Sequence, residues 1–183
     1  MAVPSAPSAV IGPVVVTAEQ IATRAYELGE EIARDHAGKD LRLITILRGG
    51  AIFLADLCRA VDMPLHLDFM SVSSYYGGSP GTVRITKDLD DPIEGAHVIV
   101  VEDIIDTGLT LNYVLRNLRM RGPASLEVCT MLDKDVRRIV ELPIAYRGFR
   151  IPDRFVVGYG LDHKGLYRNL PYVAELRDEA LGL

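Results

Sequence analysis

The stretch Val98–Thr110, VIVVEDIIDTGLT, decides how this chain folds. Its four consecutive aliphatic residues, Val98–Val101, predict a strand in the interior of a sheet, and Thr110 begins a segment with helical spacing. Ligands of open α/β sheets bind beyond the carboxyl ends of the strands. Glu102 and Asp103 come directly after this strand, so we expect both carboxylates to face a ligand. The stretch therefore predicts a parallel α/β sheet with a binding site at its edge.

The residues that follow this strand present two kinds of chemical group. The backbone N–H groups of Thr107–Thr110, at the start of a helix, suit a phosphate monoester. The carboxylates of Glu102 and Asp103 suit a diol or Mg²⁺, a hard cation that prefers oxygen ligands. A phosphate beside a diol is what ribose 5-phosphate presents. Solvated acids and a plain turn at 106–108 are the alternative, but all these features in this order favour a ribose 5-phosphate site.

The flanking segments predict an alternation of strands and helices. A capping box at Thr17 and Gln20 opens a helix that we expect to end near His36–Gly38. Further helices are expected at 51–61 and 110–121. Strands are expected at 41–47, 65–72, 83–87, 97–101 and 125–132, and shorter pieces at 144–149 and 155–160. This alternation predicts one α/β domain over residues 1–183 with a mainly parallel sheet.

Composition narrows the class of protein. The chain has 183 residues, of which 49% are hydrophobic and 25% charged, and its net charge of −5 disfavours a general affinity for nucleic acid. No run approaches the roughly 20 apolar residues of a membrane span. The first 13 residues lack the basic start of a secretory signal, so we expect a flexible lead-in over 1–13 and a cytoplasmic protein. Cys58 and Cys129 lie in apolar surroundings without metal-ligand spacing, and we expect two buried thiols.

The stretch Val98–Thr110 resembles the phosphoribosyl pyrophosphate signature of type I phosphoribosyltransferases. That signature has four aliphatics, two acids, two aliphatics, Asp-Thr-Gly, one variable residue and Thr. From about Leu43 to Leu176 the chain is similar to the hypoxanthine-guanine members of this family. The supporting segments are LRGG, SSYYGG, the LDK of Leu132–Lys134, and GFRIPDRFVVGYGLDHKGLYRNL at Gly148–Leu170.

The resemblance implies a fold and an activity. The fold would be the type I phosphoribosyltransferase fold, a twisted, parallel-rich sheet flanked by helices. A small hood would come from the N-terminal region and from about 135–183. The activity would be a pentosyl transfer in purine salvage, in which hypoxanthine or guanine reacts with phosphoribosyl pyrophosphate in the presence of Mg²⁺. The products would be IMP or GMP and pyrophosphate.

The resemblance also implies residue roles at the phosphoribosyl end of the site. The phosphoribosyl group would lie against Glu102, Asp103, Asp106, Thr107, Gly108, Leu109 and Thr110. Asp106 would be the general base at purine N7, although an aspartate here could instead only accept bonds from the loop backbone. Pyrophosphate would contact Arg48, Gly49 and Arg168. Because the family more often has Lys where Arg48 stands, the contact geometry there stays open. The expected Mg²⁺ ligands are Glu102, Asp103 and Asp162.

A second group of residues would select the base and cover the reaction. The purine would contact Lys134, Phe155, Val156 and Asp162. Lys134 carries donors only, so it favours a 6-oxo group over the 6-amino group of adenine. From the pattern alone, Lys134 could be a solvated rim residue and Phe155 a core residue. Ser73, Ser74 and Tyr75 lie in a polar, glycine-rich segment, 73–82, that resembles the mobile loop which excludes water.

Other functions stay open at this point. A xanthine-preferring phosphoribosyltransferase differs only at the C2 edge of the base, which the sequence does not define. A nucleotide-sensing RNA-binding regulator on the same fold is disfavoured by the acidic balance, although Arg116, Arg119 and Arg121 are close in sequence. The expected partners are phosphoribosyl pyrophosphate and a 6-oxopurine, with neither nucleic acid nor membrane. A homodimer or homotetramer is expected from the resemblance.

Overall fold

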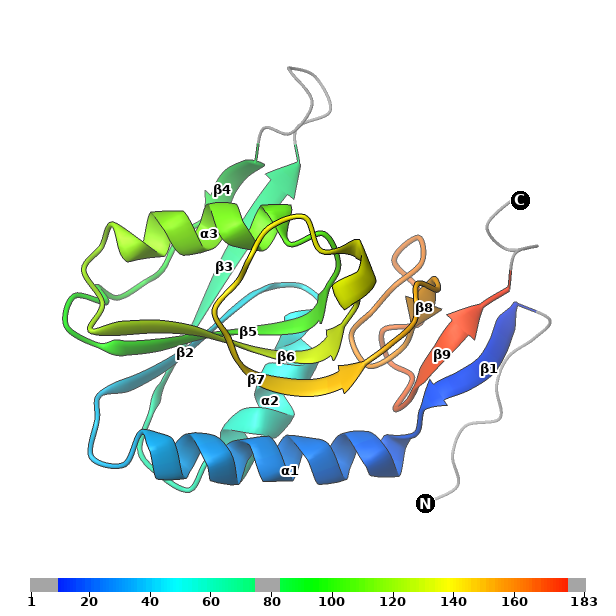
Figure 1. Ribbon diagram of the computed structural model, residues 1–183, viewed down its shortest axis with the longest axis horizontal. Helices are drawn as coiled ribbons and strands as arrows, with labels where there is room; N and C mark the ends of the chain where they lie inside the picture. The colour runs from blue at the N-terminus through cyan, green and yellow to red at the C-terminus, as the bar shows by residue number, and fades with distance from the viewer. Residues whose placement is uncertain (1–9, 75–82, 178–183) are drawn as a thin grey trace.

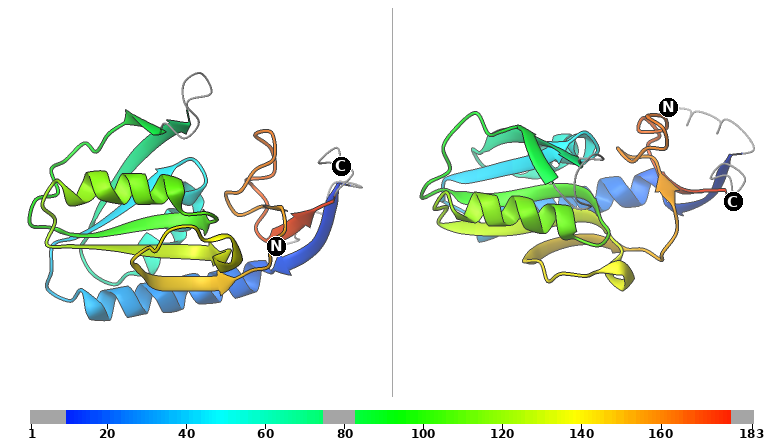
Figure 2. Two further views of the ribbon diagram at one scale, coloured as in Figure 1. Left: turned by 45° about the horizontal axis from the view of Figure 1, so that its top comes forward. Right: turned by 90° about the horizontal axis from the view of Figure 1, so that it is seen from above.

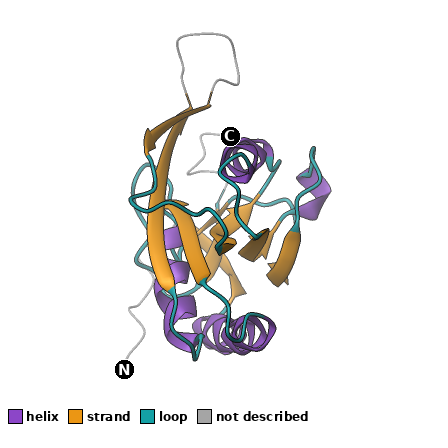
Figure 3. Ribbon diagram, turned by 90° about the vertical axis from the view of Figure 1, so that its left-hand side faces the viewer, coloured by secondary structure: helices purple, strands orange, loops and turns teal. Residues whose placement is uncertain are grey.

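The computed structural model describes residues 10–74 and 83–177. It consists of a central six-stranded sheet, helices on both faces of that sheet, and a small three-stranded sheet at one end (Figure 1). Seen from the side in Figure 3, the strands of the central sheet run between the helices. The layered arrangement agrees with the α/β fold that the alternation of strands and helices predicts.

The central sheet has the strand order β4-β3-β2-β5-β6-β7. Its strands are β2 (Leu41–Leu47), β3 (His66–Ser74), β4 (Val83–Lys87), β5 (His97–Ile105), β6 (Ser125–Asp133) and β7 (Ile144–Arg150). The edge strand β4 is antiparallel to β3, and every other neighbouring pair is parallel. The aliphatic residues Val98–Val101 of β5 have no exposed surface, as expected of a parallel strand covered on both faces.

Alternate residues of β5 pack against different helices. Ile99 and Val101 belong to a core cluster with residues of α1 (Ala18–Asp35) and α2 (Gly50–Ala60). Val98 and Val100 belong to a second cluster with residues of α3 (Leu109–Arg119). The period of two along a strand therefore divides the core into two layers. A single 3₁₀ turn, η1 (Asp135–Arg137), follows β6.

The small sheet is antiparallel and has the order β1-β9-β8. Its strands are β1 (Ile11–Val16), β8 (Val156–Val157) and β9 (Val173–Leu176). In Figures 1 and 2 it lies beyond the end toward which the arrows of β5, β6 and β7 point. The first and last described segments of the chain therefore meet at the carboxyl ends of the parallel strands.

Several boundaries differ from the sequence-based expectation. β1 begins at Ile11, so the expected lead-in over 1–13 is too long by the residues that pair with β9. The expected strand at 97–101 continues to Ile105, because β5 keeps pairing with β6 up to that residue. The expected loop at 73–82 begins later, since Ser73 and Ser74 pair with β4. Tyr75 and the rest of that segment lie outside the described residues.

Two more expectations need correction. β7 lies in the central sheet beside β6, so the segment from about 135 onward does not go as a whole to the small sheet. Cys129 is buried but Cys58 is partly exposed, and both are free thiols.

Helix α1 has the capping box expected at Thr17 and Gln20. Within 10–74 and 83–177, no helix has the length and apolar character to cross a membrane.

The crossing of α1 over α2 depends on Gly29. A Cβ at this position would lie 2.5 Å from Ala60 Cβ and 2.6 Å from Ala60 O, which is closer than van der Waals contact allows. The helix interior alone would favour alanine over glycine by about 1 kcal/mol. We therefore expect Gly29→Ala to lower the melting temperature, because the two helices must separate. Glu30→Ala, at the exposed neighbouring position, is the control; a higher melting temperature for Gly29→Ala would contradict this packing.

Candidate active site

The register between β5 and β6 places the ends of these two strands side by side. Ile105 is paired with Asp133, and the N–H of Lys134 donates to the carbonyl of Ile105 at 2.9 Å. Asp106 and Lys134 are thus the first residues to leave the sheet from adjacent strands. Asp106 of the signature stretch and Lys134, the base-binding lysine expected from the resemblance, therefore lie at one edge of the sheet.

Two cavities open at this edge and share Asp106. The first has a volume of about 220 Å³, and the second about 370 Å³. The first is lined by Ile46, Glu102, Ile104, Ile105, Asp106, Thr107, Gly108, Thr110 and Leu111. The second is lined by Asp103, Ile104, Asp106, Lys134, Arg137, Asp153, Arg154, Phe155, Val156, Leu161, Asp162 and Arg168. Ile104 and Asp106 line both cavities, so Asp106 is the acid at the boundary between the two compartments.

The first cavity is built around the start of α3. Gly108 has a φ of +80° and precedes the helix, and its carbonyl accepts from the N–H of Asn112 at 2.8 Å. The first N–H groups of a helix have no acceptor within it, so this end of α3 favours an anion. Thr107 and Thr110 border the same cavity, whereas Leu109 is half exposed and lines neither cavity.

The two adjacent acids face different cavities. They lie on β5, where successive side chains point to opposite faces, so Glu102 lines the first cavity and Asp103 the second. Burial and the neighbouring Asp103 raise the pKa of Glu102 well above its ordinary value, and Glu102 Oε1 accepts no hydrogen bond. Burial raises the pKa of Asp103 to about 6. Burial therefore disfavours the charged form of both carboxyl groups, and this holds for Asp103 even though its Oδ1 accepts from the N–H of Ile104 at 2.8 Å.

The loop after β2 approaches Asp103 so closely that only glycine fits. This loop begins with a cis peptide bond between Leu47 and Arg48. A Cβ at Gly49 would lie 1.7 Å from Asp103 Oδ2, and one at Gly50 would lie 2.2 Å from Thr45 Oγ1. The Gly49 backbone therefore packs directly against the carboxylate of Asp103, which lines the second cavity.

Arg168 joins the small-sheet region to this loop. Its Nη1 donates to the carbonyl of Gly160 at 2.5 Å, and its Nη2 pairs with the carboxylate of Asp162. A Cβ at Gly160 would lie 2.3 Å from the carbonyl oxygen of Gly49. Of the residues expected at pyrophosphate, Gly49 and Arg168 therefore meet across Gly160. The Arg48 side chain is exposed and lines neither cavity.

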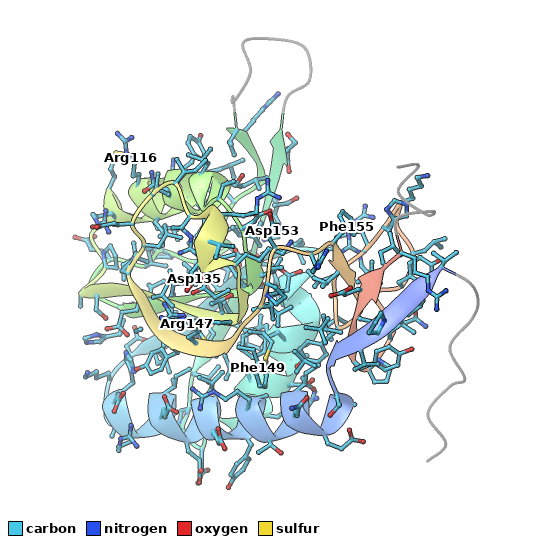
Figure 4. The ribbon with its side chains drawn as sticks, turned by 45° about the vertical axis from the view of Figure 1, so that its right-hand side comes forward. Arg116, Asp135, Arg147, Phe149, Asp153 and Phe155 are labelled. Carbon is cyan, nitrogen blue, oxygen red and sulfur yellow. The ribbon has the colours of Figure 1, made fainter. Side chains whose placement is uncertain are left out.

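The second cavity holds the residues expected at the base. Lys134 is 6% exposed, and its Nζ lies 3.9 Å from Asp153 Oδ1. Phe155 is 44% exposed and meets the ring of His163 edge-on. Figure 4 shows Asp153 and Phe155 on the segment that leads from β7 to the small sheet. Lys134 is thus not a solvated rim residue, and Phe155 is not a core residue.

Comparisons with known proteins show the family to which this chain belongs. A family model described as the phosphoribosyl transferase domain matches residues 15–164. A hypoxanthine-guanine phosphoribosyltransferase of Mycobacterium avium is 53% identical over 171 residues, covering 89% of this chain and 84% of that protein. The chain belongs to the phosphoribosyltransferase family. These matches also confirm its resemblance to the hypoxanthine-guanine members.

Solved structures of the same family have the same fold. A hypoxanthine phosphoribosyltransferase of Staphylococcus aureus superposes with a TM-score of 0.89 at 46% identity, covering 92% of this chain and 93% of that one. A mutant hypoxanthine phosphoribosyltransferase of Trypanosoma cruzi, in a ternary substrates complex, gives 0.90 at 41% identity, covering 95% and 100%. The type I phosphoribosyltransferase fold expected from the sequence is confirmed.

Three charged residues of this phosphoribosyltransferase site, Arg137, Asp153 and Arg154, were not found from the sequence, and Arg137 and Asp153 form ion pairs there. Arg137 Nε lies 3.1 Å from Asp106 Oδ1, and its Nη1 lies 3.4 Å from Asp153 Oδ1. All three residues line the second cavity. The sequence does contain one signal for Arg137 and Asp153, which is their spacing from predicted site residues. Arg137 follows Lys134 by one turn, and Asp153 precedes Phe155 by two residues. Among the described residues, the carboxylate of Asp106 accepts no hydrogen bond from a backbone N–H of the loop. The N–H of Leu109 donates to Thr107 Oγ1 at 3.4 Å instead.

The buried acids fit a divalent cation that arrives with its ligand. Within 10–74 and 83–177, no group of three or more His, Cys, Asp or Glu side chains is placed to hold a metal ion. Mg²⁺ is commonly held by one or two carboxylates together with substrate phosphates and water. Glu102 Oε1 has no hydrogen-bond partner, and the pKa of Asp103 is raised, so both carboxyls would gain from a nearby cation.

The raised pKa of Asp103 gives a testable dependence of stability on pH. Without ligand or metal, the ionised form is disfavoured in the folded chain, so this group stabilises the fold below the unfolded pKa and loses that contribution as pH rises through about 6. We expect Asp103→Asn to raise the melting temperature above pH 7 in chelator and to change it little near pH 4. Calorimetry at both pH values, with Asp62→Asn as an exposed control, checks this; an equal effect at both would contradict it.

Proposed function

We propose that this phosphoribosyltransferase transfers the 5-phosphoribosyl group of phosphoribosyl pyrophosphate to hypoxanthine or guanine, giving IMP or GMP and pyrophosphate. One observation carries the proposal: Asp106 lines both a cavity suited to a phosphate and a cavity that contains a buried lysine. A ribosyl group that spans this boundary would place its C1 beside Asp106. The identity of the relatives supports the choice of purine.

The first cavity would hold the 5-phosphate and the ribose. The N–H groups at the start of α3 would bind the phosphate, and Thr107 and Thr110 would add hydroxyl donors. Glu102 in this cavity and Asp103 in the second would accept from the ribose hydroxyls. No lysine or arginine among the described residues lines the first cavity, so backbone N–H and hydroxyl groups would bind the phosphate there.

The reaction would proceed by departure of pyrophosphate and attack of the purine N9 at C1. Asp106 would accept or hold a proton at N7 of the base, a kind of contribution typically worth about 10²- to 10⁴-fold in rate. Arg168 and the Gly49 backbone would hold the pyrophosphate. When bound at Glu102, Asp103 or Asp162, Mg²⁺ would neutralise negative charge on the pyrophosphate.

The second cavity would select the base. Lys134 would donate to the 6-oxo group, and Phe155 would cover one face of the ring. Val156 is buried and Asp162 half-buried at the wall of this cavity. Xanthine carries an acceptor at C2, so backbone carbonyls facing that edge would oppose it. A xanthine preference is the second candidate, and the choice of base in an assay separates the two.

The remaining expectations are proposals of the same kind. Ser73, Ser74 and Tyr75 would belong to a loop that closes over the reaction, although only Ser73 and Ser74 lie among the described residues. A homodimer or homotetramer in the cytoplasm is proposed from the family resemblance. The nucleotide-sensing regulator is not adopted: Arg116 and Arg119 lie in the last turn of α3, where basic side chains suit the carboxyl end of a helix, and Arg116 lies away from Asp153 and Phe155 in Figure 4.

The choice of base can be measured directly. With Mg²⁺ and phosphoribosyl pyrophosphate, we expect an absorbance change with hypoxanthine and guanine and little with xanthine or adenine. Lys134→Gln should weaken the preference for 6-oxopurines over adenine, because a neutral amide can both donate and accept. Lys164→Gln, at an exposed position, is the control. A Lys134→Gln enzyme with unchanged selectivity would remove Lys134 from base recognition, and no product with any base would point to the regulator.

The role of Asp106 separates catalysis from binding. Asp106→Asn keeps the size of the side chain but removes its basicity, so we expect turnover to fall by about 10²-fold or more while phosphoribosyl pyrophosphate still binds. Steady-state rates and calorimetric titration of phosphoribosyl pyrophosphate with Mg²⁺ provide the two measurements. Asp135→Asn, in the neighbouring η1 turn, serves as the control. Unchanged turnover of Asp106→Asn would overturn the general-base role.

A further inference from the structure

Two arginines pair with a buried aspartate next to the candidate active site. Asp133, the last residue of β6, has a side chain that is only 1% exposed. One carboxylate oxygen, Oδ1, pairs with Nη2 of Arg138, and the other accepts from Nε of Arg147 at 2.7 Å. Figure 4 labels one member of this cluster, Arg147 on β7. Both oxygens of this buried acid are therefore satisfied by guanidinium groups.

The two arginines differ in what else they hold. Arg138 also donates from Nε to the backbone carbonyl of Asp106 at 3.2 Å. Its guanidinium thus bonds the end of β6 and the loop after β5 at the same time. Among the described residues, the Arg147 side chain bonds only Asp133. The guanidinium of Arg24, on α1, donates to the backbone carbonyl of Arg147. That bond does not depend on the Arg147 side chain.

The loop after Lys134 makes a second attachment to the loop that follows β5. The N–H of Ile139 donates to the carbonyl of Thr107 at 3.1 Å, and the carbon chain of Arg138 packs beside Gly108. The segment 134–139 therefore covers the loop 106–108. A planar guanidinium with several donors suits such a double attachment, because its fork geometry is rigid.

We propose that Arg138, held by Asp133, is a positioning residue that sets the distance between Asp106 and Lys134. This inference rests on the proposed function, in which the two side chains contact neighbouring positions of one purine, N7 and the 6-oxo group. Asp106 and Lys134 lie on separate strand ends, and the backbone bond between Lys134 N and Ile105 O joins them only at the sheet edge. The Asp133–Arg138 bridge joins them again beyond that edge.

The placement of the charges supports a positioning role over a purely stabilising one. Burying a carboxylate with its cation is often no more stabilising than an apolar pair of similar volume. The gain here is a fixed orientation, since one guanidinium bonds Asp133 through Nη2 and the Asp106 carbonyl through Nε. A displacement of about 1 Å at a catalytic group can lower the rate by about 10²-fold.

Arg138→Met and Arg147→Met form a matched pair for the test. Each variant removes one guanidinium from Asp133, but only Arg138→Met releases the Asp106 carbonyl. We expect both to lower the melting temperature by similar amounts. We expect Arg138→Met alone to lower kcat, by up to about 10²-fold, and to reduce selectivity for hypoxanthine over adenine. Its KM for phosphoribosyl pyrophosphate should change little, and Arg147→Met should keep a rate close to that of the parent enzyme.

Each outcome decides the proposal. Equal loss of kcat in the two variants, or an unchanged kcat and selectivity in Arg138→Met, would overturn the positioning role and leave a structural charge cluster. If Arg138→Met does not fold, Arg138→Lys and Arg147→Lys are compared in the same way, because each keeps the charge but loses the planar fork. The test is separate from that of the proposed function: unchanged turnover in Asp106→Asn would remove the general base, whereas equal loss in the arginine variants would remove only the bridge.

Discussion

The burial of two adjacent carboxyl groups at the end of β5 is the constraint on which the candidate site depends. Placing acids where their ionised forms are poorly solvated costs folding free energy. The raised pKa values of Glu102 and Asp103 express this cost. The rest of β5 offsets it, because Val98–Val101 are fully buried between two helical layers. The core therefore stabilises a strand in which the ionised forms of Glu102 and Asp103 are unfavourable until a ligand reaches them.

The geometry around these acids is set mainly by backbone contacts. Parallel register brings the ends of β5 and β6 together, and only glycines fit where the loop after β2 meets Asp103 and where Gly160 meets that loop. The cavity walls consequently come from segments far apart in the sequence. Side chains such as Lys134 and Phe155 then enter a space whose shape the backbone has already defined. Rigid backbone placement of this kind favours precise orientation of a substrate.

The sequence predicts the central layer well and the outer parts less well. Hydrophobic runs separated by helical segments predicted β2, α2, β3, β5, α3 and β6, since each has a clear period or burial pattern. The end of β5 was missed because acidic residues normally signal the end of a buried strand, whereas here pairing with β6 continues through Glu102 and Asp103. β1, β8 and β9 are short and pair only with segments distant in the sequence, so no local pattern marks their partners. Arg137 and Asp153 were missed for a related reason: their roles come from proximity across strands.

The charges that line the two cavities explain why a cation suits this site. The first cavity contains Glu102 and Asp106 but no lysine or arginine among the described residues. The second contains Asp103, Asp106, Asp153 and Asp162, balanced by Lys134, Arg137, Arg154 and Arg168. A pyrophosphate entering alone would therefore meet no excess of positive charge, and it would approach carboxylates whose ionisation is already unfavourable. A divalent cation that enters with the pyrophosphate would reduce both repulsions, which supports the proposal that phosphoribosyl pyrophosphate binds together with Mg²⁺.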